Sequence, residues 1–166
     1  ALPISKVNIV QVEEELEYIK EYAKIIEFRF MDKIDVEITA DDAALEKPIV
    51  KLILQPLVEN AVFHGLEQKI EGGEVQVKAK MYDERHLIFT VEDNGCGMKA
   101  DKLEEVLATL ESRESTKGVG MANIYQRLRL FYGEKMEFTV ESTWGEGTKV
   151  TILVPDEVED GGVKSV

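Results

Sequence analysis

Cysteine and histidine are scarce in this sequence, which holds one cysteine and two histidines among its 166 residues. One cysteine cannot form an internal disulfide, and three such side chains are too few for a structural zinc site with four ligands. No apolar run approaches the roughly 20 residues of a membrane-spanning helix, and no segment resembles a secretory signal peptide. We therefore expect a domain that needs neither disulfides nor zinc and makes no direct membrane contact.

Basic residues are also in the minority. The chain has 33 acidic against 20 basic residues, a formal net charge of −13. Because nucleic-acid phosphates and anionic membranes attract basic surfaces, this balance argues against binding to either of them. Hydrophobic residues still make up 44% of the chain, which is enough for a core. The length corresponds to one domain with at most a short appendage.

The apolar pattern predicts a mixed fold. Helical spacing of apolar residues indicates helices at Val12–Met31, Pro48–His64, Lys102–Glu111 and Gly118–Tyr132. The pattern is weakest in Lys102–Glu111. Alternation of apolar and polar residues indicates strands at Ile34–Ile38, Val75–Met81, Leu87–Val91, Met136–Val140 and Val150–Val154. Pro56 lies inside the second helix, so we expect a kink or a break near Gln55. The order of elements predicts an α+β, two-layer sandwich with helices on one face of a mixed, mainly antiparallel sheet.

Glu59-Asn60 lies within an otherwise apolar helical stripe. An amide on a core-facing stripe needs partners, because an unpaired buried polar group costs about 1–3 kcal/mol. Two interpretations are open: a core asparagine bonded to a neighbouring loop, or an asparagine that binds a ligand or metal.

The segment Asp93-Asn94-Gly95-Cys96-Gly97-Met98 directly follows a predicted strand. Glycines let the backbone approach a flat ligand closely, while the carboxylate accepts a hydrogen bond from it. An Asn-Gly turn is the alternative, but a helix follows instead of the partner strand of a hairpin. Cys96 either fills the turn or presents its thiol to the pocket.

Two further glycine pairs complete the set. Gly118-Val119-Gly120 opens a helix whose free N–H groups and dipole favour an anion such as phosphate. Gly145-Glu146-Gly147-Thr148 joins the last two strands. Neither pair forms a Walker A loop or a dinucleotide fingerprint, because the required lysine and the parallel strand-helix-strand setting are missing.

Taken in order, these segments resemble the ATPase family shared by gyrase B, Hsp90, histidine kinases and MutL. The chain is most similar to the catalytic ATP-binding domain of LytS/YesM-type sensor histidine kinases. The segments that carry the resemblance are Gln55–Gly65, Asp93–Met98, Gly118–Ile124 with Arg127-Leu128, and Gly145–Thr148. The likeness extends from Gln11 to Pro155, because Glu13–Ile19 and Arg29-Phe30 resemble that family's linker helix.

The resemblance implies a Bergerat-type fold that binds ATP and Mg²⁺. By this likeness Asn60 would hold the Mg²⁺ that bridges the phosphates, and Glu59 would polarise the attacking nucleophile. Asp93 would accept the adenine amino group, with Thr148 supporting it through water. Gly97 would let the adenine ring lie close.

The phosphates would meet backbone N–H groups of Gly118 and Gly120, which would also hinge a lid formed by Lys99–Lys117. Other residues implied for the nucleotide site are His64, Gly95, Met98, Met121, Asn123 and Gly147.

Two departures qualify this picture. Phe63 stands where many members of the family carry a lysine that reaches phosphate, and Lys117 or Arg127 are the candidates to replace it. The family's phosphoacceptor histidine motif is absent, and His86 is expected to be an ordinary surface residue. The resemblance therefore implies residues 1–32 as a linker helix from an upstream dimerisation region, 33–155 as the ATPase domain and 156–166 as a flexible tail.

The implied function is transfer of the γ-phosphoryl group of ATP to a histidine in an upstream segment, and onward to an aspartate of a response regulator. The domain would lie on the cytoplasmic side of a membrane-anchored bacterial sensor kinase. Two alternatives stay open: an anti-sigma factor of the serine-kinase type, and a nucleotide-binding regulatory module without turnover.

Overall fold

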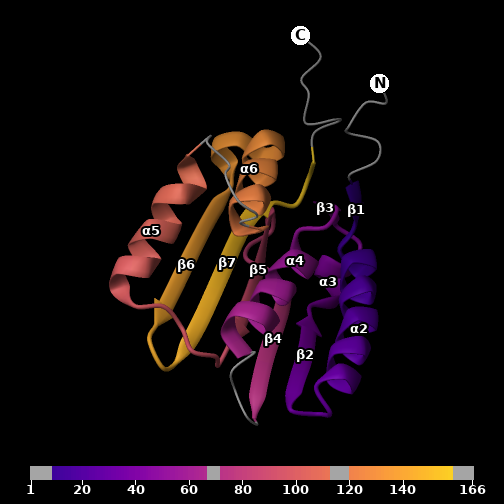
Figure 1. Ribbon diagram of the computed structural model, residues 1–166. Coiled ribbons are helices and arrows are strands. Elements are labelled where there is room, and N and C mark those ends of the chain that lie inside the picture. Colours follow the sequence, from indigo (N-terminus) through magenta and orange to yellow (C-terminus); the bar gives the residue numbers. More distant parts are fainter. Residues whose placement is uncertain (1–8, 67–71, 113–119, 159–166) are drawn as a thin grey trace, which may run out of the picture.

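The computed structural model describes residues 9–66, 72–112 and 120–158 and shows two layers (Figure 1). One layer is a five-stranded sheet in the order β2-β4-β5-β7-β6. Its strands are β2 (Ile34–Ala40), β4 (Gly73–Met81), β5 (His86–Asp93), β6 (Glu137–Thr143) and β7 (Gly147–Pro155). Only β2 and β4 pair in parallel, and the other three pairings are antiparallel. The α+β sandwich with a mixed, mainly antiparallel sheet is confirmed.

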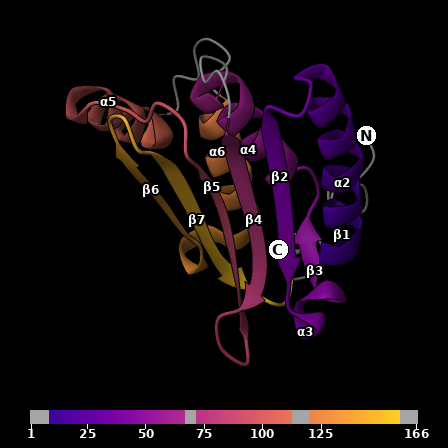
Figure 2. The same cartoon turned by 90° about the horizontal axis from the view of Figure 1, so that it is seen from below.

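The second layer is helical and covers one face of the sheet (Figure 2). Its main helices are α2 (Val12–Arg29), α4 (Leu54–Asn60), α5 (Ala100–Glu111) and α6 (Gly120–Tyr132). One hydrophobic cluster joins alternate strand residues such as Val77, Phe89 and Ile152 to buried residues of the helices, including Leu16 and Ile19 of α2. Because side chains alternate along a strand, the opposite face of the sheet carries the polar residues.

The helix expected from Pro48 was wrong over its first part. Pro48–Val50 is a strand, β3, which pairs antiparallel with β1 (Ile9–Gln11). Leu52 then takes a left-handed conformation, φ 60°, which a right-handed helix cannot accommodate. The chain therefore breaks at residues 51–53, and α4 begins only at Leu54. Pro56 falls in the first turn of α4, where backbone N–H groups have no intrahelical partner, so it disturbs nothing.

Asn60 is the last residue of α4, and the chain continues as a π-helix, η1 (Ala61–Leu66). Gly65, a residue type that commonly follows the end of a helix, lies inside this π-helix. Three further short elements were not predicted: β1, α3 (Asp42–Leu45) and a 3-10 helix, η2 (Gly133–Lys135).

The predicted linker helix shares its core with the rest of the fold. Leu16, Ile19 and Ile26 of α2 belong to the same hydrophobic cluster as the sheet. The helix ends at Arg29 because Met31 and Asp32 adopt positive φ angles of 55° and 63°. The domain boundary between residues 32 and 33 stays a prediction.

At the other end of the fold, the N–H of Asp156 donates to the carbonyl of Arg85 over 2.8 Å. The Asp156 carboxylate also pairs with Lys47 at 3.0 Å. The first residue of the predicted tail is therefore fixed to the domain, while residues 159–166 lie outside the described part. Within the described ranges, no helix combines the length and apolar character of a membrane span.

Candidate functional site

A cavity of about 760 Å³ lies on the helical side of the sheet, between β5, β7 and the helices α4, η1, α5 and α6. Residues from segments far apart in the sequence meet there. The predicted site residues that line it are Asn60, His64, Asp93, Gly97, Met98, Gly120, Met121 and Thr148. The sequence segments singled out for chemistry thus converge on one space.

Asp93 supplies a buried carboxylate at the end of β5, with 8% of its surface exposed. Its Oδ1 accepts the N–H of Gly95 at 2.9 Å. The carboxylate also lies against the backbone of Gly65, where an added Cβ would be 2.7 Å from Oδ1. Asp93 pairs with Thr148 across β5 and β7, so both side chains lie on the same face of the sheet.

Ser142 organises the hydroxyl groups beside Asp93. It donates to the carbonyl of Gly147 at 3.1 Å and accepts the N–H of Met98 at 2.8 Å. Its oxygen is 2.8 Å from Thr148 Oγ1. Because the single proton of Ser142 is donated to Gly147, Thr148 is the donor of this pair. Sequence reasoning missed Ser142, although its place on the inward face of β6 was readable from the alternation.

The glycines of the site are required by the chain's own backbone. Gly97 has φ 67°, and an added Cβ would lie 2.0 Å from the carbonyl oxygen of Thr143. At Gly95, a Cβ would lie 2.0 Å from the carbonyl oxygen of Gly65. Gly95 and Gly147 do not line the cavity, so they shape it by letting neighbouring loops touch. Gly97 does both.

Asn60 and Gly120 meet at another part of the cavity wall. A Cβ on Gly120 would lie 3.4 Å from both Oδ1 and Nδ2 of Asn60. The amide thus sits beside the first described turn of α6. Gly118 and Lys117, also predicted for this region, lie outside the described residues. Asn123 is exposed on α6 and does not line the cavity.

Glu59 belongs to a different environment from Asn60. Its carboxylate accepts a hydrogen bond from Gln55 Nε2 at 3.3 Å and does not line the cavity. Burial, followed by the charge of Glu59, raises the pKa of Tyr22 on α2 to about 12. The carboxylate is therefore placed toward α2, and its predicted role toward a nucleophile stays a prediction.

The positive charge missing at Phe63 is not replaced by Arg127. The guanidinium of Arg127 donates to the carbonyls of Lys51 and of Leu52, the latter at 2.8 Å, and is absent from the cavity wall. Phe63 packs against the core, with the Arg29 guanidinium 5.8 Å from its ring centroid.

Two lysines line the cavity instead, Lys99 and Lys102 at the start of α5. Lys99 Nζ lies 5.0 Å from the ring centroid of Trp144, which also lines the cavity although 59% of its surface is exposed. Sequence reasoning placed both lysines only within a broad lid segment and did not anticipate Trp144, which no local pattern distinguishes.

Cys96 serves the structure of the loop. Its N–H donates to the Gly65 carbonyl at 2.9 Å, and its carbonyl accepts the N–H of Gly145. The thiol contacts the His64 carbonyl at 3.4 Å and does not line the cavity. The alternative of a thiol presented to the pocket is not what the structure shows.

His86 is a partly exposed residue that pairs with Asp83, whose Oδ1 is 2.8 Å from its Nδ1. The N–H of Arg85, and then His86, lower the pKa of Asp83. His86 is thus a surface residue at the β4–β5 turn, as expected.

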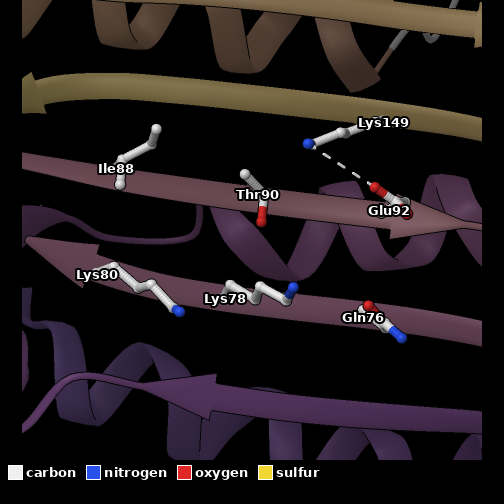
Figure 3. Close-up of a pocket in the computed structure, with 7 residues that line it drawn as sticks. All are labelled: Gln76, Lys78, Lys80, Ile88, Thr90, Glu92 and Lys149. Atoms are coloured by element: carbon white, nitrogen blue, oxygen red, sulfur yellow. Dashed lines mark ion pairs between the residues drawn. The ribbon is translucent and has the colours of Figure 1, made fainter. Parts of the chain in front are cut away.

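A second hollow, of about 180 Å³, lies on the uncovered face of the sheet. Its side chains lie spread along β4, β5 and β7 rather than converging on one point (Figure 3). Lys149 and Glu92 face each other there at 3.9 Å. The hollow holds no buried polar group, so the larger cavity is the candidate site.

Comparison with known proteins agrees with this geometry. The family of histidine kinase-, DNA gyrase B- and HSP90-like ATPases matches residues 45–158. Sensor protein LytS of Bacillus cereus is 30% identical over 161 residues, which are 95% of this chain and 27% of LytS. Sensor histidine kinase YesM of Bacillus subtilis is 33% identical over 150 residues, 90% of this chain and 24% of YesM. The chain spans about a quarter of the length of these relatives.

Solved structures show the same fold. The catalytic domain of histidine kinase ThkA superposes with a TM-score of 0.62 at 14% identity, covering 91% of this chain and 97% of that domain. The histidine kinase domain of a blue-light activated kinase from Erythrobacter litoralis EL346 gives 0.59 at 24% identity, covering 84% and 59%. This likeness confirms the Bergerat-type fold. By its sequence match and its fold, the chain belongs to the family of histidine kinase-, DNA gyrase B- and HSP90-like ATPases.

Proposed function

We propose that the chain is the Mg-ATP-binding catalytic domain of a two-component sensor histidine kinase. It would transfer the γ-phosphoryl group of ATP to a histidine in another segment of the full protein. The observation that carries the proposal is that one cavity is lined both by the buried carboxylate of Asp93 and by the amide of Asn60 beside the start of α6.

Asp93 suits the adenine end of the nucleotide. A buried carboxylate needs hydrogen-bond donors, and the adenine amino group is a donor on a flat ring. Apolar side chains of Leu57, Val91 and Val150 line the same cavity and suit the faces of that ring. Thr148, held by Ser142, would support the Asp93 contact.

Asn60 suits the phosphate end together with Mg²⁺. The described residues contain no group of three or more histidine, cysteine, aspartate and glutamate side chains that would cage a metal. Mg²⁺ commonly keeps several waters and binds through few protein oxygens plus substrate phosphates, which fits a single amide ligand. When bound, the ion would neutralise phosphate charge. Gly120, and Gly118 by the family likeness, would offer N–H groups.

The chain's own residues would act mainly by positioning. Phosphoryl transfer depends chiefly on alignment and on neutralising developing charge. Lys99, Lys102 and His64 line the cavity and are the side chains there that can face anionic oxygens. We retain Glu59 as a candidate to polarise the nucleophile only on the family likeness, since its carboxylate is placed toward Gln55 and Tyr22.

The acceptor and the cellular setting belong to the same proposal. The relatives are named sensor proteins roughly four times as long as this chain. We therefore place the dimerisation segment and the acceptor histidine elsewhere in the full protein, with a response regulator downstream. The domain itself would face the cytoplasm from a membrane-anchored kinase.

Calorimetric titration with ATP, with and without Mg²⁺, tests the site. Asp93→Ala should weaken ATP binding under both conditions, while Asn60→Ala should remove only the gain that Mg²⁺ brings. Asp35→Ala, an exposed carboxylate on β2, is the matched control and should bind as the wild type does. Unchanged affinity in both site variants would contradict the assignment.

Transfer of phosphate tests the activity. The full-length protein incubated with radiolabelled ATP should acquire an acid-labile, alkali-stable phosphate, as phosphohistidine does. An acid-stable label on a partner protein would favour the serine-kinase alternative. Nucleotide binding without any transfer would favour the regulatory module.

A further inference from the structure

Glu15 on α2 is a buried carboxylate outside the cavity. Only 1% of its surface is exposed, and among the described residues it and Asp93 are the buried polar or charged side chains. A buried charge persists only where hydrogen bonds and countercharge compensate it. The contacts of Glu15 therefore indicate what it holds in place.

Those contacts are three consecutive backbone N–H groups. Glu15 accepts the N–H of Leu52, of Ile53 at 3.3 Å and of Leu54 at 3.2 Å. Leu54 opens α4, and Ile53, the residue before it, makes no side-chain cap. The first N–H groups of a helix have no intrahelical partners, so the carboxylate of one helix caps the start of another.

Arg127 on α6 holds the same loop from the other side. Its guanidinium donates to the carbonyls of Lys51 and Leu52. Leu52 has φ 60°, a conformation that a leucine keeps only where its surroundings enforce it. Glu15 fixes the N–H groups of residues 52–54 and Arg127 fixes the carbonyls of residues 51 and 52, an arrangement we call the Glu15–Arg127 clamp.

The clamp lies at the start of α4 and in the middle of α6, away from the point where the two helices meet at the cavity. Asn60 is six residues beyond Leu54, about 9 Å along α4 at 1.5 Å per residue. Gly120 is seven residues before Arg127, about 10 Å along α6. The helices touch again where Gly120 approaches the Asn60 amide. The separation of the two helices is therefore set by contacts at both places.

We propose that Glu15 is a positioning residue of the nucleotide site, which sets the position of Asn60 against Gly120 through the Glu15–Arg127 clamp. A movement of α2 would then alter Mg-dependent phosphate binding and leave the Asp93 end unchanged, because Asp93 is held by β5 and its neighbouring loops. This inference rests on the proposed function, since it assigns Asn60 to Mg²⁺ and phosphate.

The experiment measures ATP affinity with and without Mg²⁺ in the wild type and three variants at mildly alkaline pH. Glu15→Gln replaces one acceptor oxygen by a donor that opposes the backbone N–H groups. Arg127→Met releases the carbonyls while keeping a long side chain. Glu14→Gln makes the same change of charge at the neighbouring, exposed position and is the control. Circular dichroism confirms that each variant is folded at the assay temperature.

We expect Glu15→Gln to weaken Mg-ATP binding by about tenfold, the scale of one lost charge-assisted hydrogen bond. Binding without Mg²⁺ should change by less than about twofold, within ordinary surface-substitution effects. Arg127→Met should show the same selectivity, and Glu14→Gln should match the wild type. If Glu15→Gln does not fold, Arg127→Met tests the inference by the same comparison, the loss of ATP affinity with Mg²⁺ against the loss without it.

Equal losses with and without Mg²⁺ would mean that Glu15 only stabilises the fold, and the inference would be overturned. If Mg²⁺ raised the ATP affinity of Glu15→Gln and Arg127→Met as much as it raises that of the wild type, the inference would also be overturned, while the proposed function would stand. If the wild type itself bound no ATP, the proposed function would fail and the inference with it.

Discussion

Gly145 lies in the turn between β6 and β7 and Gly147 is the first residue of β7, yet an added methyl group would meet different surroundings at each. Both have positive φ, 130° and 85°. A Cβ at Gly147 would lie 2.0 Å from the carbonyl oxygen of Asp93, whereas a Cβ at Gly145 has no heavy atom within 4 Å. Replacing each glycine by alanine therefore separates backbone strain from a clash at the site.

The two substitutions share backbone strain and a stiffer unfolded chain, and they differ in the clash at Gly147, which sets the difference in the free energy of unfolding. A left-handed alanine costs roughly 1–2 kcal/mol, and stiffening of the unfolded chain returns about 0.4–1 kcal/mol. Both terms apply to either position, and because φ 130° lies further from the left-handed region than φ 85° does, the strain at Gly147 is no smaller than that at Gly145. Gly147→Ala adds a contact at 2.0 Å, where ordinary contact begins at 3.4 Å, so β5 and β7 must separate. Overpacking of this kind costs about 1–3 kcal/mol.

Urea denaturation should therefore give Gly147→Ala a free energy of unfolding lower than that of Gly145→Ala by about 1–3 kcal/mol. Displacing the Asp93 backbone moves its carboxylate, so ATP affinity should fall by about tenfold or more in Gly147→Ala. Gly145→Ala should keep wild-type affinity. Equal stability and equal affinity in the two variants would refute the reasoning.

Three further predictions concern Glu15, Phe63 and Ser142. Burial holds the pKa of Glu15 above its ordinary value of 4.5 despite the N–H groups of Leu52, Leu54 and Ile53 and the charge of Arg127. The folded state therefore binds this proton more tightly than the unfolded state. The stability contribution of Glu15 is full below the unfolded pKa and is lost as pH rises through the folded pKa. The wild-type free energy of unfolding minus that of Glu15→Gln should thus decline as pH rises across this window, and a flat difference would argue against a raised pKa. Phe63→Lys should lower the free energy of unfolding by about 1–3 kcal/mol, because a packed ring is lost and a second cation is placed near Arg29. It should bring no gain in ATP affinity, and a tighter complex would show that position 63 does reach the phosphates. Ser142→Ala should cost about 1–3 kcal/mol in urea denaturation, since the Met98 N–H loses its acceptor, and a neutral substitution would contradict the role given to that hydroxyl.

Much of the fold was predictable because local pattern and tertiary burial agree. The buried residues of α2 recur at steps of three and four, and β4, β5 and β7 alternate cleanly. The prediction failed at residues 48–53 because their apolar pattern suits a helix as well as a short strand. The pairing of β3 with β1 and the capping of residues 52–54 by Glu15 decide the outcome, and both contacts come from nearly 40 residues away.

The candidate site was predictable where the chemistry is carried by short segments. Asp93, Gly97 and Asn60 stand out because acids, amides and glycines break an apolar pattern. The direction in which a side chain points was harder to predict from the sequence. Glu59 and Asn60 are neighbours in sequence, yet consecutive residues on a helix point about 100° apart, so only Asn60 lines the cavity. Trp144 and Ser142 reach the site through the folding of the β6–β7 hairpin.

The most direct test of the central claim is the thermal unfolding midpoint of the chain with ATP, in the presence and absence of Mg²⁺. A ligand that binds only the folded state adds about 2.7 kcal/mol at 100 times its dissociation constant. We predict a rise with ATP that becomes larger when Mg²⁺ is added, and a smaller rise in Asp93→Ala. A midpoint that stays unchanged at millimolar ATP with Mg²⁺ would contradict the assignment of the cavity as a nucleotide site.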